Sequence, residues 1–66
     1  MVGKVTEISA TSKVGFEDAI KQGIARAGKT IRNIKSAWVK EQTVRVDKGQ
    51  ITEYQVNILV TFVLED

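Results

Sequence analysis

The stretch FEDAIKQGIARAGKTI, residues 16–31, decides the fold, because its apolar and small residues recur at helical spacing. They lie three or four positions apart and so form one stripe along an α-helix: Phe16, Ala19, Ile20, Gly23, Ile24, Ala27 and Ile31. Thr11 or Ser12 can cap the start of this helix. Gly23 and Gly28 disfavour a helix, so each is expected to permit close packing against a sheet or to mark fraying near the helix end.

The segments on both sides of the helix have the composition and alternation of β-strands. Residues 2–10 predict a first strand, and a second strand is expected from just after Asn33 to Val46. The DKG sequence at residues 47–49 predicts a turn, and residues 50–66 predict the last strand. Alternate residues of this last strand are apolar and share one face: Tyr54, Val56, Ile58, Val60, Phe62 and Leu64.

The order of these elements is β-α-β-β. It predicts an α+β fold in which one helix packs on a three-stranded antiparallel sheet, with residues 1–66 forming a single domain. A hairpin centred on the turn places Val39 near Ile58 on the helix side of the sheet and Gln42 near Gln55 on the polar side.

The period of two along the second strand assigns its side chains to faces. Ser36, Trp38 and Lys40 are expected on the polar face. Glu41 and Arg45 are expected on the opposite face if the alternation is unbroken, and a β-bulge would be needed to change that.

The length and composition limit how the chain can be stabilised. A chain of 66 residues buries only about 60% of its unfolded surface, so its own core is expected to be marginal. The sequence contains neither Cys nor His, which excludes a disulfide and a Cys/His zinc site and leaves only a hard cation held by oxygen ligands. Association between copies remains as the main source of extra stability.

The same composition limits the classes of function. A formal net charge of +2 with scattered basic residues does not favour nucleic-acid binding. No long apolar segment indicates an export signal or a membrane span, which predicts a cytoplasmic protein with no membrane partner. Without His, Cys or a glycine-rich phosphate loop, the chain lacks the usual groups for catalysis, and we expect that it is not an enzyme.

Four stretches, taken in order, resemble the dodecin family over nearly the whole chain. They are ATS (residues 10–12), FEDAI (16–20), ARAGKTIRNI (25–34) and YQVNILVTFVLED (54–66). The resemblance implies a non-enzymatic, hollow shell of twelve identical chains. Many members of the family bind flavins as stacked pairs at the twofold axes of this homododecamer.

In the family, a Trp near the start of the second strand stacks on the flavin ring and a Gln in the third strand bonds its polar edge. Gln55 matches that Gln, whereas a gapless count places the Trp position at Ser36. Trp38 comes two residues later, on the same face but about 6.6 Å along the strand. Lys40 and Gln42 are expected beside Trp38, and Lys40 is either solvated or a partner for a ligand phosphate.

Two interpretations of Trp38 follow. A bulge after Ile34 would restore the indole to the stacking position, and flavin (FMN or riboflavin) would then be bound for storage and photoprotection, because an electron-rich indole quenches the excited ring. Alternatively, the chain resembles a branch of the family without the stacking Trp. Trp38 would then be a contact between subunits, and the shell would be a structural or storage cage for cations or other small molecules.

Overall fold

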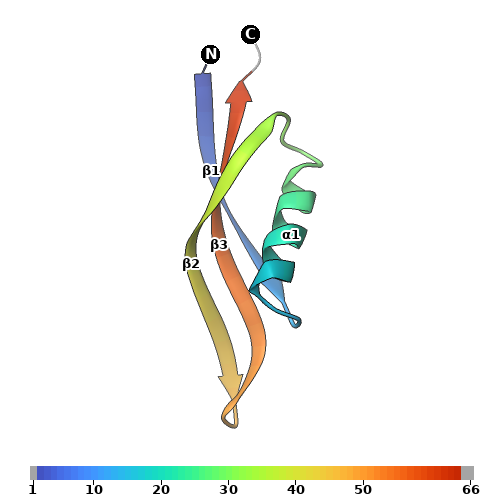
Figure 1. Cartoon of the computed structure of the whole chain (residues 1–66), viewed down its shortest axis with the longest axis vertical. Coiled ribbons are helices and arrows are strands. Elements are labelled where there is room, and N and C mark those ends of the chain that lie inside the picture. Colours follow the sequence, from blue (N-terminus) through green and yellow to red (C-terminus); the bar gives the residue numbers. More distant parts are fainter. Residues whose placement is uncertain (1, 65–66) are drawn as a thin grey trace.

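The computed structural model describes residues 2–64 and contains one helix and one sheet (Figure 1). The elements follow in the order β1 (Val2–Ser12), α1 (Phe16–Ala27), β2 (Ile34–Asp47) and β3 (Gln50–Leu64). The strand order is β1-β3-β2, and both pairs are antiparallel. The predicted α+β fold with the order β-α-β-β is confirmed, while the last two residues of the predicted third strand, 65 and 66, lie outside the described residues.

The start of α1 differs from the sequence prediction. Gly15 occupies the N-cap position, and no side chain caps the helix. The buried hydroxyl of Ser12 instead accepts hydrogen bonds from the backbone N–H groups of Val14 (2.9 Å) and Gly15 (3.4 Å) and donates one to Asp18 (2.6 Å). Ser12 therefore fixes the turn between β1 and α1, which is a local bonding pattern that competes with capping.

The two helix glycines have different roles. A Cβ atom added to Gly23 would lie 3.1 Å from the Cβ of Ala10 and 3.4 Å from the Cδ1 of Ile58, so this glycine allows the helix to approach the sheet closely. Gly28 follows the last helical residue, and its N–H donates to the carbonyl of Ile24 at 2.9 Å. Asn33, directly before β2, has a positive φ of 62°.

The hydrophobic core lies between α1 and one face of the sheet. Its fully buried side chains are Ala19, Val56, Ile58 and Val60. Partly buried apolar side chains surround them: Ile8, Ala10, Phe16, Ile20, Ile24 and Ile34. This core is small for a folded domain, and it leaves large apolar residues such as Val46 and Ile51 more than half exposed. The expectation that the chain needs further partners to bury its apolar surface agrees with this exposure.

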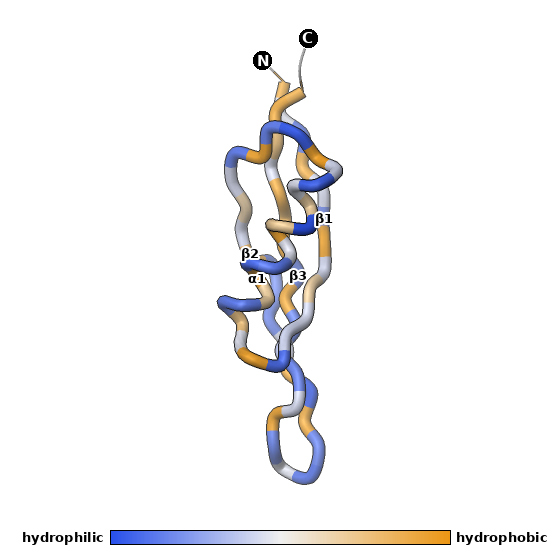
Figure 2. The backbone as a smooth tube through the Cα atoms, turned by 90° about the vertical axis from the view of Figure 1, so that its right-hand side faces the viewer, coloured by the Kyte–Doolittle hydropathy of each residue, from blue (hydrophilic) through white to orange (hydrophobic). Residues whose placement is uncertain are grey.

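The chain is elongated because the β2–β3 hairpin continues past the N-terminal end of the helix (Figure 1). Its extents are 52 × 19 × 13 Å and its radius of gyration is 13.6 Å, whereas a compact domain of this length would have a radius of gyration of about 11 Å. Apolar and hydrophilic residues alternate along the strands of this long sheet (Figure 2). Within residues 2–64, no helix has the length and hydrophobicity needed to cross a membrane.

Candidate functional site

The side of the sheet that faces away from α1, called the open face below, carries the candidate site. The buried residues Val56, Ile58 and Val60 mark the helix side of β3, so the alternate residues of that strand lie on the open face. The register adds their neighbours on the outer strands. The open face comprises Glu7, Ser9 and Thr11 on β1, Gln55, Asn57, Leu59 and Thr61 on β3, and Ser36, Trp38, Glu41 and Thr43 on β2.

An irregularity in β2 changes two of the predicted faces. Val39 is opposite Ile58, as predicted, but the next paired residue is Glu41, opposite Asn57. Lys40 is therefore an extra residue, and a bulge of this kind shifts the alternation of every residue that follows. The prediction that Gln42 lies near Gln55 on the polar face is wrong, because Gln42 is opposite the buried Val56.

The same bulge brings other polar side chains to the open face. Thr43 is the residue opposite Gln55, and Glu41 and Arg45 fall on the open face instead of the helix side. Arg45 contacts Glu53 across the hairpin at 3.4 Å. The sequence predicts this arrangement only if β2 contains a bulge. Position 40 is a Lys, and not a Gly or Pro that would have indicated a bulge there.

Trp38 and Ser36 occupy neighbouring positions of the open face. Trp38 is opposite Leu59 and is 50% exposed, and Ser36 is opposite Thr61 and is also exposed. A second register shift lies between Ile34 and Ser36, at the place where the first interpretation of Trp38 requires a bulge. An indole that is half exposed on a sheet face offers one flat surface to a ligand or to another protein chain.

Two polar side chains of the open face are tied to β1 across the sheet. The Nε2 of Gln55 donates a hydrogen bond to the Oγ of Ser9 at 3.3 Å. The Nζ of Lys40 lies 3.3 Å from Oε1 of Glu7, and both side chains are about half exposed. Lys40 therefore reaches over the open face, as predicted, but it has a carboxylate partner that a ligand phosphate would have to displace.

Trp38 and Gln55 are far apart within one chain. The partner of Trp38, Leu59, is four residues along β3 from Gln55, which corresponds to about 13 Å at the rise of an extended strand. A ring stacked on the indole would have its centre within about 7 Å of it. The indole and the amide of one chain therefore lie at different levels of the open face, and a second copy is one way to bring both groups to the same ring.

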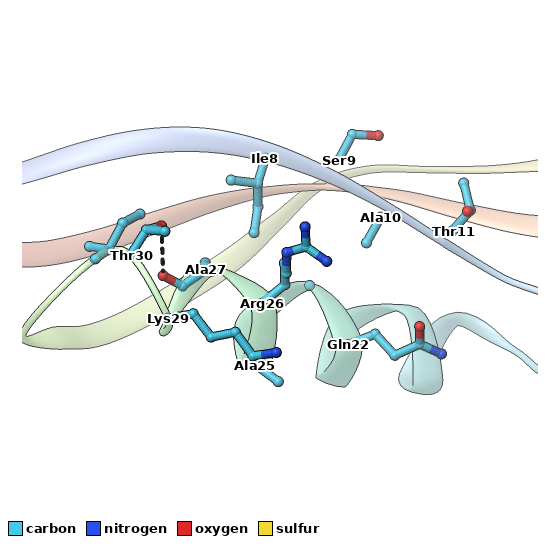
Figure 3. A pocket seen from close by; sticks show the side chains of 12 residues that line it. Ile8, Ser9, Ala10, Thr11, Gln22, Ala25, Arg26, Ala27, Lys29 and Thr30 are labelled. Carbon is cyan, nitrogen blue, oxygen red and sulfur yellow. Dashed lines mark hydrogen bonds between the residues drawn. The ribbon is translucent and has the colours of Figure 1, made fainter.

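Other site types find less support in the described part of the chain. Residues 2–64 contain no group of three or more Asp, Glu, His or Cys side chains that could hold a metal ion within one chain. A groove of about 680 Å³ lies on the opposite side of the sheet, between β1 and α1 (Figure 3). None of the five predicted site residues lines it. The sequence did not predict this groove, which is lined in part by the small residues Gly23 and Ala27 of the apolar helix stripe.

The sequence profile of one family, Dodecin, matches residues 2–65. The chain belongs to the dodecin family. A dodecin from Thermus thermophilus is 40% identical over 65 residues, which cover 98% of this chain and 94% of that protein. The crystal structure of an R45A mutant of the Thermus thermophilus dodecin has a TM-score of 0.92, at 40% identity and with 98% and 97% of the two chains covered.

Two further dodecin structures show the range of the family. The dodecin from Streptomyces davaonensis has a TM-score of 0.93 at 37% identity, covering 98% of this chain and 96% of that one. The calcium dodecin from Mycobacterium tuberculosis, described as a calcium-chelating antigen with a novel calcium-binding site, has a TM-score of 0.84 at 33% identity, covering 98% and 93%. Dodecins are small ligand-binding proteins that assemble from identical subunits, and this chain has their fold.

Proposed function

We propose that this dodecin assembles into a hollow shell of twelve copies that binds and sequesters flavin, as FMN or riboflavin, without chemical turnover. The observation that carries the proposal is the half-exposed Trp38, which lies on an open sheet face that also holds Gln55. The indole supplies a stacking surface, and the amide supplies donors and an acceptor for the polar edge of the ring. A cytoplasmic location is part of the same proposal.

Sequestration follows from the chemistry of the face. The side chains around Trp38 and Gln55 are hydroxyls, an amide, carboxylates and Lys40, so they can bind and orient a ligand. The chain has no His or Cys to act as a base or nucleophile. Stacking a flavin against an electron-rich indole would quench the excited ring, so storage would also protect against flavin photochemistry.

The site is formed between copies in this proposal. The separation of about 13 Å along β3 between Gln55 and the partner of Trp38 supports a site in which one copy supplies the indole and another the amide. A twofold axis that relates two open faces would create such a site twice. Ser36, Lys40 and Gln42 complete the set of candidate ligand-binding residues, although Gln42 would reach the ligand only from the helix side of its own sheet.

A second candidate function is a flavin-free cage that holds cations. Two observations favour it: the gapless count places Ser36 at the family's stacking position, and one relative is a calcium dodecin. Since no single chain gathers a group of carboxylates within the described residues, such a cation would be a hard ion bound between copies. Glu41 and Glu7 on the open face are the carboxylates that two copies could bring together.

Titration with FMN and riboflavin tests the proposal. If flavin stacks on Trp38, flavin and tryptophan fluorescence should be quenched together, at about one flavin per chain. The variant Trp38→Ala should weaken binding by about one to two decades, since stacking of a base on an aromatic ring is worth roughly 1–3 kcal/mol. No quenching in the wild type, with quenching gained in Ser36→Trp and calcium binding detected by calorimetry, would instead select the cation cage.

A further inference from the structure

Two apolar side chains of the open face, Trp38 and Leu59, form a platform that ends at a carboxylate. Trp38 on β2 is opposite Leu59 on β3, and Leu59 is in turn opposite Glu7 on β1. The three residues therefore form one row across the sheet. Neighbouring strands lie about 4.8 Å apart, so the row spans about 10 Å from Trp38 to Glu7. A flat ring that covers both Trp38 and Leu59 ends close to Glu7.

The bulge in β2 places a cation beside the same platform. Counted by the alternation from Trp38, Lys40 is on the open face, and Glu41, which follows the register shift, is on that face as well. Bulges re-aim the side chains next to them in this way. The Nζ of Lys40 reaches across the central strand, β3, to within 3.3 Å of Oε1 of Glu7 on β1. This ion pair forms the polar border of the platform.

The ion pair of Lys40 and Glu7 is open to competition from a ligand. The two side chains are 49% and 43% exposed, in that order. Among residues 2–64, each is the only ion-pair partner of the other. A pair as exposed as this one contributes little to stability, so the chain loses little when a ligand anion takes the place of the carboxylate. Both partners belong to the same chain as Trp38, so the border is in place whichever copy supplies Gln55.

The charges of the pair oppose each other at the border. A phosphate bound there is attracted by the ammonium group of Lys40 and repelled by the carboxylate of Glu7. The two groups are exposed to a similar extent, so water screens them similarly. The carboxylate also accepts one of the three hydrogen bonds that the ammonium group can donate. The pair therefore offers a phosphate little net attraction, whereas an uncharged ring substituent meets no penalty.

We propose that Glu7 is a specificity-determining residue of the open-face site, which acts by neutralising Lys40. This inference rests on the proposed function and deepens it, because it assigns the part of the ligand that is recognised. The site selects the flat flavin ring and is nearly indifferent to the phosphate. FMN and riboflavin should then bind the wild-type protein with Kd values within about threefold of each other.

The test is the ratio of the Kd for riboflavin to the Kd for FMN, measured by flavin fluorescence in low-salt buffer. Glu7→Gln keeps the size of the side chain and removes its charge, which frees the ammonium group, so the ratio should rise by about three- to tenfold. Lys40→Gln leaves the carboxylate uncompensated, so the ratio should fall below the wild-type value. The double variant removes both charges and should return the ratio to near that of the wild type.

Two controls separate this role from a purely structural one. Glu17→Gln removes the acid of another exposed ion pair, the one with Lys21 on the surface of α1 at 3.2 Å, and should leave the ratio unchanged. Salt gives the second control, since about 1 M NaCl shortens the Debye length to about 3 Å. The difference between Glu7→Gln and the wild type should shrink there, whereas a packing effect of the substitution would not depend on salt.

The outcomes separate the two proposals. A wild-type protein that binds neither flavin would overturn the proposed function, and the role of Glu7 with it. Flavin binding with a ratio that Glu7→Gln does not change, or that Glu17→Gln changes equally, would overturn the role of Glu7 alone. Opposite shifts of the ratio in the two single variants, with a return in the double variant, are the result that this role requires.

Discussion

The distance between Trp38 and Gln55 predicts a specific complementation between two variants. Trp38→Ala removes the stacking surface, and Gln55→Ala removes the amide, and neither residue belongs to the buried core. Stacking is worth roughly 1–3 kcal/mol and a hydrogen bond about 1 kcal/mol. The Kd for FMN should therefore rise by about one to two decades in Trp38→Ala and by about fivefold in Gln55→Ala.

Refolding the two variants together in equal amounts should restore some sites. If one copy supplies the indole and another the amide, each partner is intact with a probability of one half, so about one quarter of the sites carry both groups. If one chain supplied both groups, every site in the mixture would lack one of them. The fraction of sites with wild-type affinity, measured as the tight phase of an FMN titration by flavin fluorescence, distinguishes the two cases.

Two controls complete this experiment. The two variants refolded separately and then mixed should show no tight phase, provided that the shells do not exchange subunits. Sedimentation velocity should show that the mixed shells have the wild-type size. Mixed shells of native size with no tight phase, although the wild type binds FMN tightly, would refute the reasoning that the site is formed between copies.

Three further predictions concern the fold and the site. Gly23→Val should destabilise the protein by about 1–3 kcal/mol through overpacking, because its Cβ would lie 3.1 Å from that of Ala10. Gly28→Ala, at a helical φ of −63°, should instead stabilise the protein by about 0.5–1 kcal/mol. Urea denaturation at one fixed protein concentration should show these opposite signs. Ile58→Ala should cost about 2–5 kcal/mol, since the side chain is fully buried, and a loss below 1 kcal/mol in the same assay would mean that this core is not the main one. Lys40→Ala should change stability by less than about 1 kcal/mol, because the ion pair of Lys40 is half exposed. The same variant should remove any preference for FMN over riboflavin if the ammonium group contacts the phosphate. An unchanged preference in parallel titrations would mean that Lys40 contacts only its carboxylate partner, Glu7.

The parts of the fold that the sequence predicted are those governed by local periodicity. The apolar stripe of residues 16–31 predicted α1, although the helix ends at Ala27. The alternation in residues 50–64 predicted which face of β3 is buried, and the turn at residues 47–49 predicted that Val39 lies opposite Ile58. Each of these features depends on residues that are close in sequence or on the pleat of a strand.

The parts that the sequence did not predict depend on contacts between distant segments. The bulge at Lys40 depends on how β2 twists against β3, and no residue type at that position requires it. It moved Gln42 to the helix side and Glu41 to the open face. The separation of Trp38 from Gln55 also became measurable only with the register, and it supports the proposal that the site uses two copies.

Native mass spectrometry of the protein as purified tests the proposed flavin-binding shell, because one spectrum reports both the number of copies and any bound ligand. A flavin-loaded shell of twelve copies should give a species of about 88 kDa, twelve times the chain mass of 7.3 kDa, with additional mass equal to FMN or riboflavin. Activation in the gas phase should release that ligand. A spectrum dominated by the 7.3 kDa monomer, recorded from a non-denaturing solution, would contradict the proposed shell.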